Sequence, residues 1–502
     1  MMAQYLEIKA GHEDALLFYR MGDFYELFFD DAKAAAAALD IALTHRGKHL
    51  GEDIPMCGVP AHSAESYLLT LIRKGFRVAV AEQMEDPAEA KKRGAKAVVK
   101  RAVTRLVTPG TLTEDALLEA RRHNYLAAVA EVRGEGAVAW VDVSTGDFHV
   151  APVAGAARGP LLARLAPREV LVPEDAADEP GVEEAGGTLT PLARSSFDST
   201  AAAGRVAAAL GVGTLDGFGS FSRPELSAMG AIVAYLELTQ RGRMPRLRPP
   251  VQERPGGAMQ IDAATRRNLE LTRSLTGGRG DTLLAAIDRT VTGPGARLLE
   301  TRLTAPLTEL AAIRARADQV SDFVADRGLA AEVRDGLRAA PDMERALSRL
   351  ALDRGGPRDL GAVRDGLAAG AALAERLTDE LAPETVAARA RLTGLEELAA
   401  RLAATLRPDL PTLARDGGFI AAGVDDDLDE ARRLRDEGRS VIAAMQAEFA
   451  AATGIASLKV RHNNVLGYFI EVTATHGDKM LADTRFIHRQ TTASALRFTT
   501  PE

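Results

Sequence analysis

The chain has 502 residues, of which 46% are hydrophobic and 26% charged, a composition typical of soluble globular proteins. This length exceeds what one core can bury, so we expect three or four domains. The single cysteine, Cys57, excludes a disulfide framework, and no segment predicts a signal peptide or a membrane span. We therefore expect a cytoplasmic protein without a membrane partner. The net charge of −8 argues mildly against a nucleic-acid-coated surface, although local patches decide such binding.

The first informative stretch is Gly22-Asp23-Phe24-Tyr25-Glu26-Leu27-Phe28. An apolar run before it, Leu16–Tyr19, predicts a buried strand, and apolar residues from Tyr25 to Leu39 recur at helical spacing. We expect the strand to turn into a helix here, with Asp23 as N-cap and Glu26 completing a capping box. Phe24 would then be partly exposed beside a carboxylate, which packing alone does not explain. The stretch is either a helix cap or a binding site.

The sequence up to residue 112 mixes strand and helix patterns. Leu68–Ile72 favours a helix, Val78–Ala81 a strand, and the glycines and prolines of Gly47–Pro60 a loop region. A basic run follows that contains no acid over fifteen residues: Lys91, Lys92, Arg93, Lys96, Lys100, Arg101 and Arg105. This run is either a solvated loop or a phosphate-binding surface.

Pro109-Gly110 marks the first predicted boundary. Strand-like runs then follow at Tyr125–Val129, Ala137–Val143 and Phe148–Val150, the hairpin pattern of an α/β domain. Asp142 and Asp147 raise the alternative of a metal-dependent nuclease, but the sequence offers no convincing further set of carboxylates. The acidic stretch 173–187 is typical of a loop or linker.

Helical patterns dominate after the Pro- and Gly-rich break at 245–257. One apolar stripe consists of Leu310, Ile313, Val320, Phe323 and Val324. A charged helix is expected over Asp425–Ala452, and strands from about Ile455 onward. Positive charge in that last part comes from Arg485, His488, Arg489 and Arg497.

The blocks along the chain resemble the MutS family of DNA mismatch-repair proteins. They stand in the family's order: LLFYRMGDFYELFFDD over 16–31, IPMCGVPAH over 54–62, EQMEDP over 82–87, VTPGT over 107–111, DAATRRNLE over 262–270 and NNVLGY over 463–468. These short blocks are spread over nearly all of the chain. The resemblance therefore does not rest on a lone Phe-x-Glu, which would be weak evidence.

The resemblance implies a multidomain fold that combines α/β and all-α parts. Its expected domains are a mixed α/β mismatch-recognition domain (1–112), an RNase H-like α/β connector (113–240), a long-helix core and lever domain (241–438) and a small β-rich clamp (439–502).

The resemblance also implies a DNA site that recognises mispaired or looped duplex. Phe24 would insert in the minor groove and stack on a mispaired base, and Glu26 would hydrogen-bond to that base, in its protonated form where the base nitrogen is an acceptor. Candidate backbone contacts are Arg46, Lys96, Lys100, Arg101, Arg105, Arg489, Ser494 and Arg497. The chain departs from many relatives at Ala493, where they carry a lysine, so the clamp contact is in doubt there.

The resemblance assigns ATP and magnesium to the complete family protein rather than to this chain. No G-x-x-x-x-G-K-[ST] segment occurs in it, so we expect a partial chain that ends before the ATPase domain. A homodimer and a MutL-type repair partner are implied for the complete protein. The alternatives are a helical scaffold or a nuclease without mismatch specificity.

Overall fold

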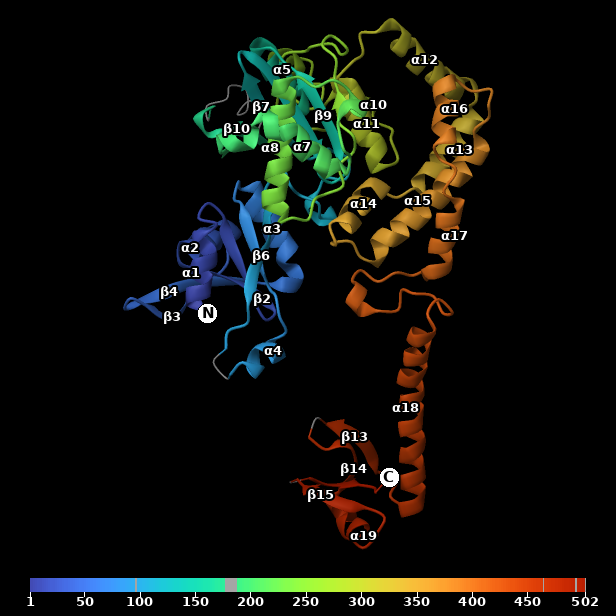
Figure 1. The fold of residues 1–502 in the computed structure, drawn as a ribbon. Coiled ribbons are helices and arrows are strands. Elements are labelled where there is room, and N and C mark those ends of the chain that lie inside the picture. Colours follow the sequence, from blue (N-terminus) through green and yellow to red (C-terminus); the bar gives the residue numbers. More distant parts are fainter. Residues whose placement is uncertain (95–96, 177–186, 464, 493, 502) are drawn as a thin grey trace. The chain divides into compact units, whose positions relative to one another are not determined.

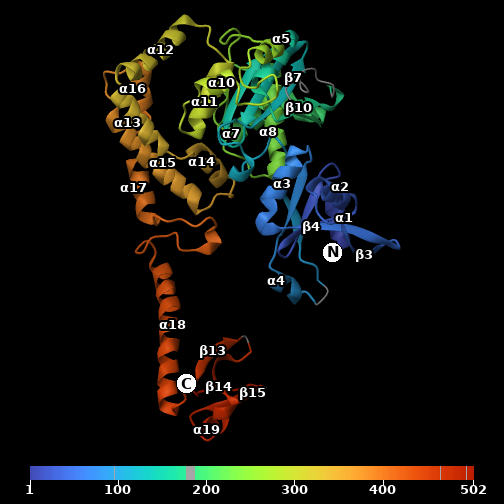
Figure 2. The same cartoon turned by 180° about the vertical axis from the view of Figure 1, so that it is seen from behind.

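The computed structural model describes residues 1–94, 97–176, 187–463, 465–492 and 494–501 (Figures 1 and 2). Two compact units divide the chain: residues 1–403 with 408–419, and residues 404–407 with 420–502. Among the described residues, no helix combines the length and apolar character needed to cross a bilayer. The mixed α/β and all-α class predicted from the sequence is confirmed.

The N-terminal part of the first unit is a six-stranded sheet in the order β3-β4-β2-β1-β5-β6. Its strands are β1 (Leu16–Met21), β2 (Phe24–Phe28), β3 (Thr44–His49), β4 (Glu52–Pro60), β5 (Val78–Gln83) and β6 (Arg101–Val107). The helices of this part are α1 (Met2–Ala10), α2 (Phe29–Leu39), α3 (Ala64–Arg73) and α4 (Pro87–Lys92). One face of the sheet packs on α2 and α3, and the other is partly covered by α1.

The predicted helix start at Phe24 is wrong, because residues 24–28 form a strand between two antiparallel neighbours. Strand β2 pairs with β1 on one side and β4 on the other, and α2 begins only at Phe29. Tyr25 and Leu27 alternate into the core, which is the period of a strand. Asp23 therefore lies in the hairpin turn with Gly22, whose φ is +58°, and Glu26 completes no capping box.

The predicted loop over Gly47–Pro60 is also wrong. Strands β3 and β4 form a hairpin whose turn consists of Leu50 and Gly51, with φ values of +52° and +94°. Gly51 supplies a left-handed conformation that such a tight turn requires. Arg46 therefore lies on the edge strand β3, in a register irregularity between His45, which pairs with Pro55, and Lys48, which pairs with Asp53.

A second six-stranded sheet follows in the order β11-β10-β7-β8-β9-β12. Its strands are β7 (Tyr125–Val132), β8 (Glu135–Asp142), β9 (Asp147–Pro152), β10 (Glu169–Pro173), β11 (Thr188–Leu192) and β12 (Val251–Gln252). Helix α5 (Gly155–Leu165) covers one face, while α7 (Ser199–Leu210) and α8 (Arg223–Gln240) cover the other. The three strands predicted for this α/β part are present, and most of the acidic stretch lies outside the described residues.

Glu169 joins the two sheets through a fully buried carboxylate. It accepts hydrogen bonds from Thr108 Oγ1 at 2.5 Å, Gly110 N at 3.0 Å, Thr190 Oγ1 at 2.7 Å and Tyr235 Oη at 2.6 Å. The segment that the sequence marks as a boundary is therefore held in the interior against β10. Four donors satisfy this carboxylate, which offsets the cost of burying it.

Residues 263–405 are helical. The helices are α9 (Ala263–Asn268), α10 (Leu283–Ile287), α11 (Gly293–Thr304), α12 (Leu310–Ala325), α13 (Arg327–Arg338), α14 (Met343–Ala351), α15 (Pro357–Arg376), α16 (Pro383–Ala390) and α17 (Glu396–Thr405). The predicted stripe lies on α12, but its residues Leu310, Ile313, Val320 and Val324 are exposed.

Two buried arginines attach these helices to the segment before β7. Arg297 of α11 donates to Ala120 O at 2.8 Å and pairs with Asp342 at 2.7 Å. Arg345 of α14 donates to the carbonyls of Glu119 and Arg122 at 3.1 and 2.7 Å. Both side chains are 1% exposed, so their charged groups form contacts inside this unit rather than on its surface.

The second unit contains α18 (Asp426–Thr453), α19 (Gly477–Leu481) and a four-stranded antiparallel sheet in the order β13-β14-β16-β15. Its strands are β13 (Lys459–Asn463), β14 (Gly467–Thr473), β15 (Ile487–Thr491) and β16 (Ala495–Thr499). Apolar residues of this sheet, of α19 and of the end of α18 form one core. The boundaries between the four predicted domains stay predictions. Helix α18 runs without a break across the predicted boundary at residue 438.

We expect Glu169→Ala to destabilise the first unit strongly. The variant leaves the buried hydroxyls of Thr108, Thr190 and Tyr235 without their acceptor, at a cost of about 3–5 kcal/mol. Differential scanning calorimetry should show a thermal midpoint lower by roughly 5–15 °C. Glu131→Ala, at an exposed surface pair with Arg158, is the matched control and should change it little. An unchanged midpoint in Glu169→Ala would contradict this role.

Candidate functional site

Phe24, Glu26 and Phe28 share one face of β2, where Phe28 is buried, Glu26 is partly buried and Phe24 is exposed. The ring of Phe28 packs at 5.0 Å from Tyr5 of α1. Beyond the reach of α1, Phe24 stays 47% exposed, as the sequence predicted. A large aromatic side chain in water at the end of a sheet is costly unless it is used in binding.

The structure brings two of the predicted site residues into direct contact. Arg46 Nη1 lies 2.6 Å from Glu26 Oε2 and 2.8 Å from Oε1, so one donor group bridges both carboxylate oxygens. The Glu26 side chain is 15% exposed and that of Arg46 is 46% exposed. The predicted phosphate contact Arg46 is therefore bound to the predicted base contact Glu26 in the protein without DNA.

Sequence reasoning missed two residues that contact the strand carrying Glu26, namely Gly58 and Glu82. Gly58 of β4 stands opposite Glu26, and a Cβ there would lie 3.7 Å from Glu26 Cγ and 3.9 Å from Phe24 Cδ1. On the opposite side of β2, Tyr25 donates its hydroxyl hydrogen bond to Glu82. Burial, with Glu82 nearby, raises the pKa of Tyr25 to about 12, so this bond persists at neutral pH. Gly58 and Glu82 both fall in sequence blocks that were noted only for the family resemblance.

Several cations of the basic run are paired with acids and are less available for phosphate than the sequence suggested. Acids just before the run pair with it: Glu89 with Lys92 at 2.7 Å, and Glu85 with Arg93. Lys100 is exposed, and its side chain makes no hydrogen bond or ion pair among the described residues, although its charge helps to lower the pKa of Glu85. Lys96 lies outside the described residues.

The other two arginines of the run point into the structure. Arg101 Nε donates to the carbonyl of Arg20 at 2.6 Å, and its guanidinium lies 4.8 Å from the Tyr19 ring centroid. Arg105 is paired with Glu114, and burial lowers its pKa to about 10, with Arg354 adding repulsion. The charges of both residues are therefore engaged in holding β6 in place.

The candidate residues of the second unit lie on and beside its sheet edge. Strand β15 is exposed along its length, and Arg489 Nε donates to Thr499 Oγ1 at 2.8 Å. Arg497 is bound to Glu471 at 3.1 Å and lies 4.7 Å from the ring centroid of Phe469. Ser494 is exposed, and the doubtful position 493 is outside the described residues.

Asp142, the residue that raised the nuclease alternative, is fully buried and hydrogen-bonded. It accepts from Ser144 Oγ at 2.6 Å and from the backbone of Asn124 at 3.2 Å, and it lies 2.9 Å from His123 Nδ1. Burial raises the pKa of Asp142, but the hydrogen bonds and charges of His123, Ser144 and Arg345 together hold it below its usual range. Within the described ranges, no three His, Cys, Asp or Glu side chains gather where a metal ion could bind. The geometry lends the nuclease alternative no support.

Comparison with known families matches nearly the whole chain in three segments. Residues 1–116 match the profile of MutS domain I, 124–248 that of MutS domain II and 264–476 that of MutS domain III. Phe24, Glu26 and Arg46 all fall within the first segment, and the Glu169 junction joins the first segment to the second.

Curated relatives are similar over the full length of this chain. The DNA mismatch repair proteins MutS of Paracoccus denitrificans and of Dinoroseobacter shibae are each 65% identical to it, and that of one Cereibacter sphaeroides strain is 64% identical. The alignments cover 100% of this chain but only 57–58% of the relatives. The chain thus spans less than two thirds of their length.

A double-mutant cycle on Glu26→Ala and Arg46→Ala should give a small favourable coupling free energy. Because Arg46 is half-exposed, we expect about 0.2–1 kcal/mol in urea unfolding, decreasing with added salt. The pair of Lys48 and Asp53, 4.0 Å apart and exposed on the same hairpin, is the control and should show no measurable coupling. Equal coupling in both cycles would show that the Glu26–Arg46 contact is not specific.

Proposed function

This chain belongs to the MutS family of DNA mismatch-repair proteins, and from that premise we propose that it binds mispaired or looped duplex DNA through Phe24 and Glu26. The observation that carries the proposal is the exposed Phe24 ring beside the Glu26–Arg46 pair. Phe24 and Glu26 lie on strand β2, which is hydrogen-bonded to β1 on one side and to β4 on the other, so the positions of both residues are fixed by the sheet.

Phe24 is the wedge in this proposal. A mispaired step stacks poorly, so it costs less to open and kink than a Watson–Crick step. An apolar ring inserted from the minor groove makes use of that difference and stacks on the exposed base. Tyr25 and Leu27, on either side of Glu26, are packed in the core. The backbone of β2 therefore does not have to rearrange when the Phe24 ring inserts into the DNA.

Glu26 and Arg46 exchange partners in the proposed binding step. In the protein alone, Arg46 neutralises the carboxylate that DNA phosphates would repel. A phosphate that approaches the hairpin competes for the Arg46 guanidinium, which frees Glu26 to hydrogen-bond with the mispaired base. Matched DNA offers no displaced base in return, so the exchange favours mismatched duplex.

Weaker, sequence-independent contacts would come from the remaining cations. Lys100 is the best placed of the basic run, because its side chain is exposed and makes no hydrogen bond or ion pair among the described residues. Arg489, Ser494 and Arg497 of the second unit remain proposed backbone contacts, as do Lys96 and Arg101. Arg105 is the least suitable candidate, since its guanidinium is buried against Glu114.

The activities of the complete relatives extend beyond this chain. ATP-dependent steps with magnesium, a homodimer, a MutL-type partner and a cytoplasmic location are proposed for a complete protein of this family. The residues present do not fit the ATP group: no P-loop sequence occurs among the 502 residues, and the described side chains form no metal cluster. No step is therefore assigned to ATP in this chain.

Phe24→Ala should remove the preference for mismatched DNA and leave weak, salt-sensitive binding to any duplex. Loss of one stacked base costs about 1–3 kcal/mol, and the kink depends on it. The measurement is a pair of dissociation constants for a G·T duplex and its matched control. Leu238→Ala, at another exposed apolar residue, should keep wild-type discrimination. Full discrimination by Phe24→Ala would refute the wedge.

Glu26→Gln should tighten binding to matched duplex more than to mismatched duplex. The amide is not repelled by phosphates, and Arg46 loses its carboxylate partner and is free to bind DNA. Discrimination should therefore narrow from the matched side, by up to about fivefold if the Glu26–Arg46 coupling is about 0.2–1 kcal/mol. Asp53→Asn, which removes a carboxylate from the same hairpin, should leave discrimination unchanged. If Glu26→Gln moves neither constant, Glu26 does not contact DNA.

A further inference from the structure

A cavity of about 530 Å³ lies in the first unit, between the β7-β8-β9 face of the second sheet and helices α9 and α11. The family block 262–270, which the proposed DNA site does not use, contributes to one wall through Arg266 and Arg267. Its volume falls in the range of small-molecule sites, and residues from the sheet, α5, α9 and α11 converge on it.

One wall of this cavity is aromatic. Trp140 of β8 and His149 of β9 are directly paired across the strands, and their rings stack with centroids 5.4 Å apart and planes 7° apart. His123 and Tyr125 form a second stacked pair at 4.7 Å. His149 Nδ1 is buried without a hydrogen-bond partner among the described residues. The rings of His149 and Tyr125 line the cavity, so a planar ligand would meet aromatic side chains on this wall.

The opposite wall carries an excess of positive charge. Five arginines line the cavity against two carboxylates, those of Glu253 and Glu300: Arg122, Arg164, Arg266, Arg267 and Arg273. Arg266 is held by the carbonyls of Ile261 and Thr304 at 2.9 and 2.8 Å. Burial and the nearby Arg164 lower the pKa of Arg266 to about 10, and the carboxylate of Asp262 acts in the opposite direction.

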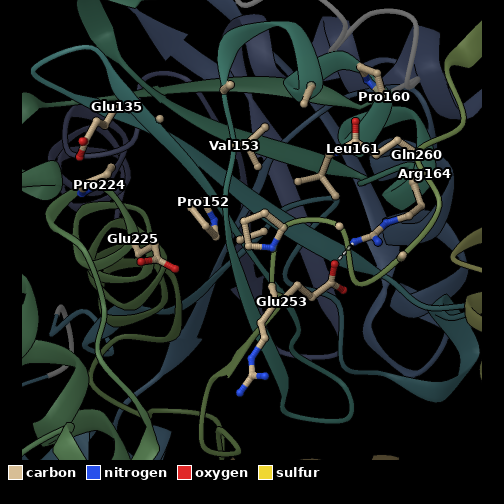
Figure 3. A pocket seen from close by; sticks show the side chains of 18 of the residues that line it. Glu135, Pro152, Val153, Pro160, Leu161, Arg164, Pro224, Glu225, Glu253 and Gln260 are labelled. Carbon is tan, nitrogen blue, oxygen red and sulfur yellow. Dashed lines mark hydrogen bonds and ion pairs between the residues drawn. The ribbon is translucent and has the colours of Figure 1, made fainter. Parts of the chain in front are cut away.

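A neighbouring cavity of about 700 Å³ shares Arg164, Glu253 and Arg266 but differs in chemistry (Figure 3). Figure 3 shows Arg164 and Glu253 pointing toward each other, and their ion pair measures 2.7 Å. Proline and aliphatic side chains line most of this neighbour, including Pro152, Val153 and Leu161. It therefore lacks the pairing of aromatic and cationic walls that distinguishes the first cavity.

We propose that the cavity between β7-β8-β9 and α9 binds a nucleoside monophosphate, with the base against the His149 and Tyr125 rings and the phosphate at Arg266 and Arg267. Aromatic faces stack on any nucleobase, and guanidinium groups bind phosphate oxygens through paired hydrogen bonds. This site is separate from the Phe24 surface, needs no P-loop, and does not depend on the proposed mismatch binding.

The test uses the 502-residue chain and adenosine 5′-monophosphate. Trp140 is the single tryptophan of the chain and lines the cavity, so its fluorescence reports on occupancy. We expect saturable quenching by the nucleotide, with adenosine and inorganic phosphate each binding at least about tenfold more weakly, because each lacks one half of the contacts. Equilibrium dialysis with labelled nucleotide checks the same affinity without relying on fluorescence.

Arg267→Ala is the decisive variant, because the side chain of Arg267 is exposed and makes no hydrogen bond or ion pair among the described residues. It should weaken nucleotide binding about fivefold or more without lowering the thermal midpoint, and mismatch discrimination should stay as in wild type. Arg302→Ala, an exposed arginine of α11 outside the cavity, is the matched control and should bind like wild type. No binding at millimolar nucleotide, equal binding of adenosine, or wild-type affinity in Arg267→Ala would each overturn the proposal.

Discussion

The candidate DNA surface depends on strand β2 being paired along both edges. With β1 on one side and β4 on the other, its backbone hydrogen bonds are made, and its side chains must alternate between the two faces. Tyr25 and Leu27 enter the core, so Phe24 and Glu26 have no other place than the opposite face. Only the short helix α1 covers that face, and it covers Phe28 rather than Phe24.

Several charged side chains of the first unit are buried and make their hydrogen bonds and ion pairs inside it. Arg297 and Arg345 are almost fully buried against backbone carbonyls, Arg105 is paired with Glu114, and Glu169 collects four donors at the junction of the two sheets. Such groups are costly to leave unpaired, so they fix the neighbouring segments in one arrangement. Local groups of cations rather than the net charge of −8 would decide the proposed DNA binding.

The cavity beside Trp140 shows a second use of the same architecture. Cross-strand pairing sets Trp140 and His149 face to face, while the block 262–270 brings arginines to the other side. Trp140 and His149 belong to one hairpin, but the block 262–270 is more than a hundred residues away from them in sequence. A ligand site of this kind is therefore invisible to spacing rules, because it is formed by a sheet face and a helix separated by more than a hundred residues.

The sequence by itself determined the family, the α/β and helical classes, most strands and long helices, and the exposure of Phe24. Periodicity and ordered blocks carry that information locally. Only the tertiary structure decided that residues 24–28 are a strand, that Gly47–Pro60 is a hairpin, and that Arg46 binds Glu26. Five residues with mixed apolar spacing fit a helix start as well as a strand, and pairing with β1 and β4 resolves the ambiguity. Arg46 and Glu26 are twenty residues apart in sequence and lie on strands that β4 separates, so the sheet order and the irregularity of β3 make them neighbours.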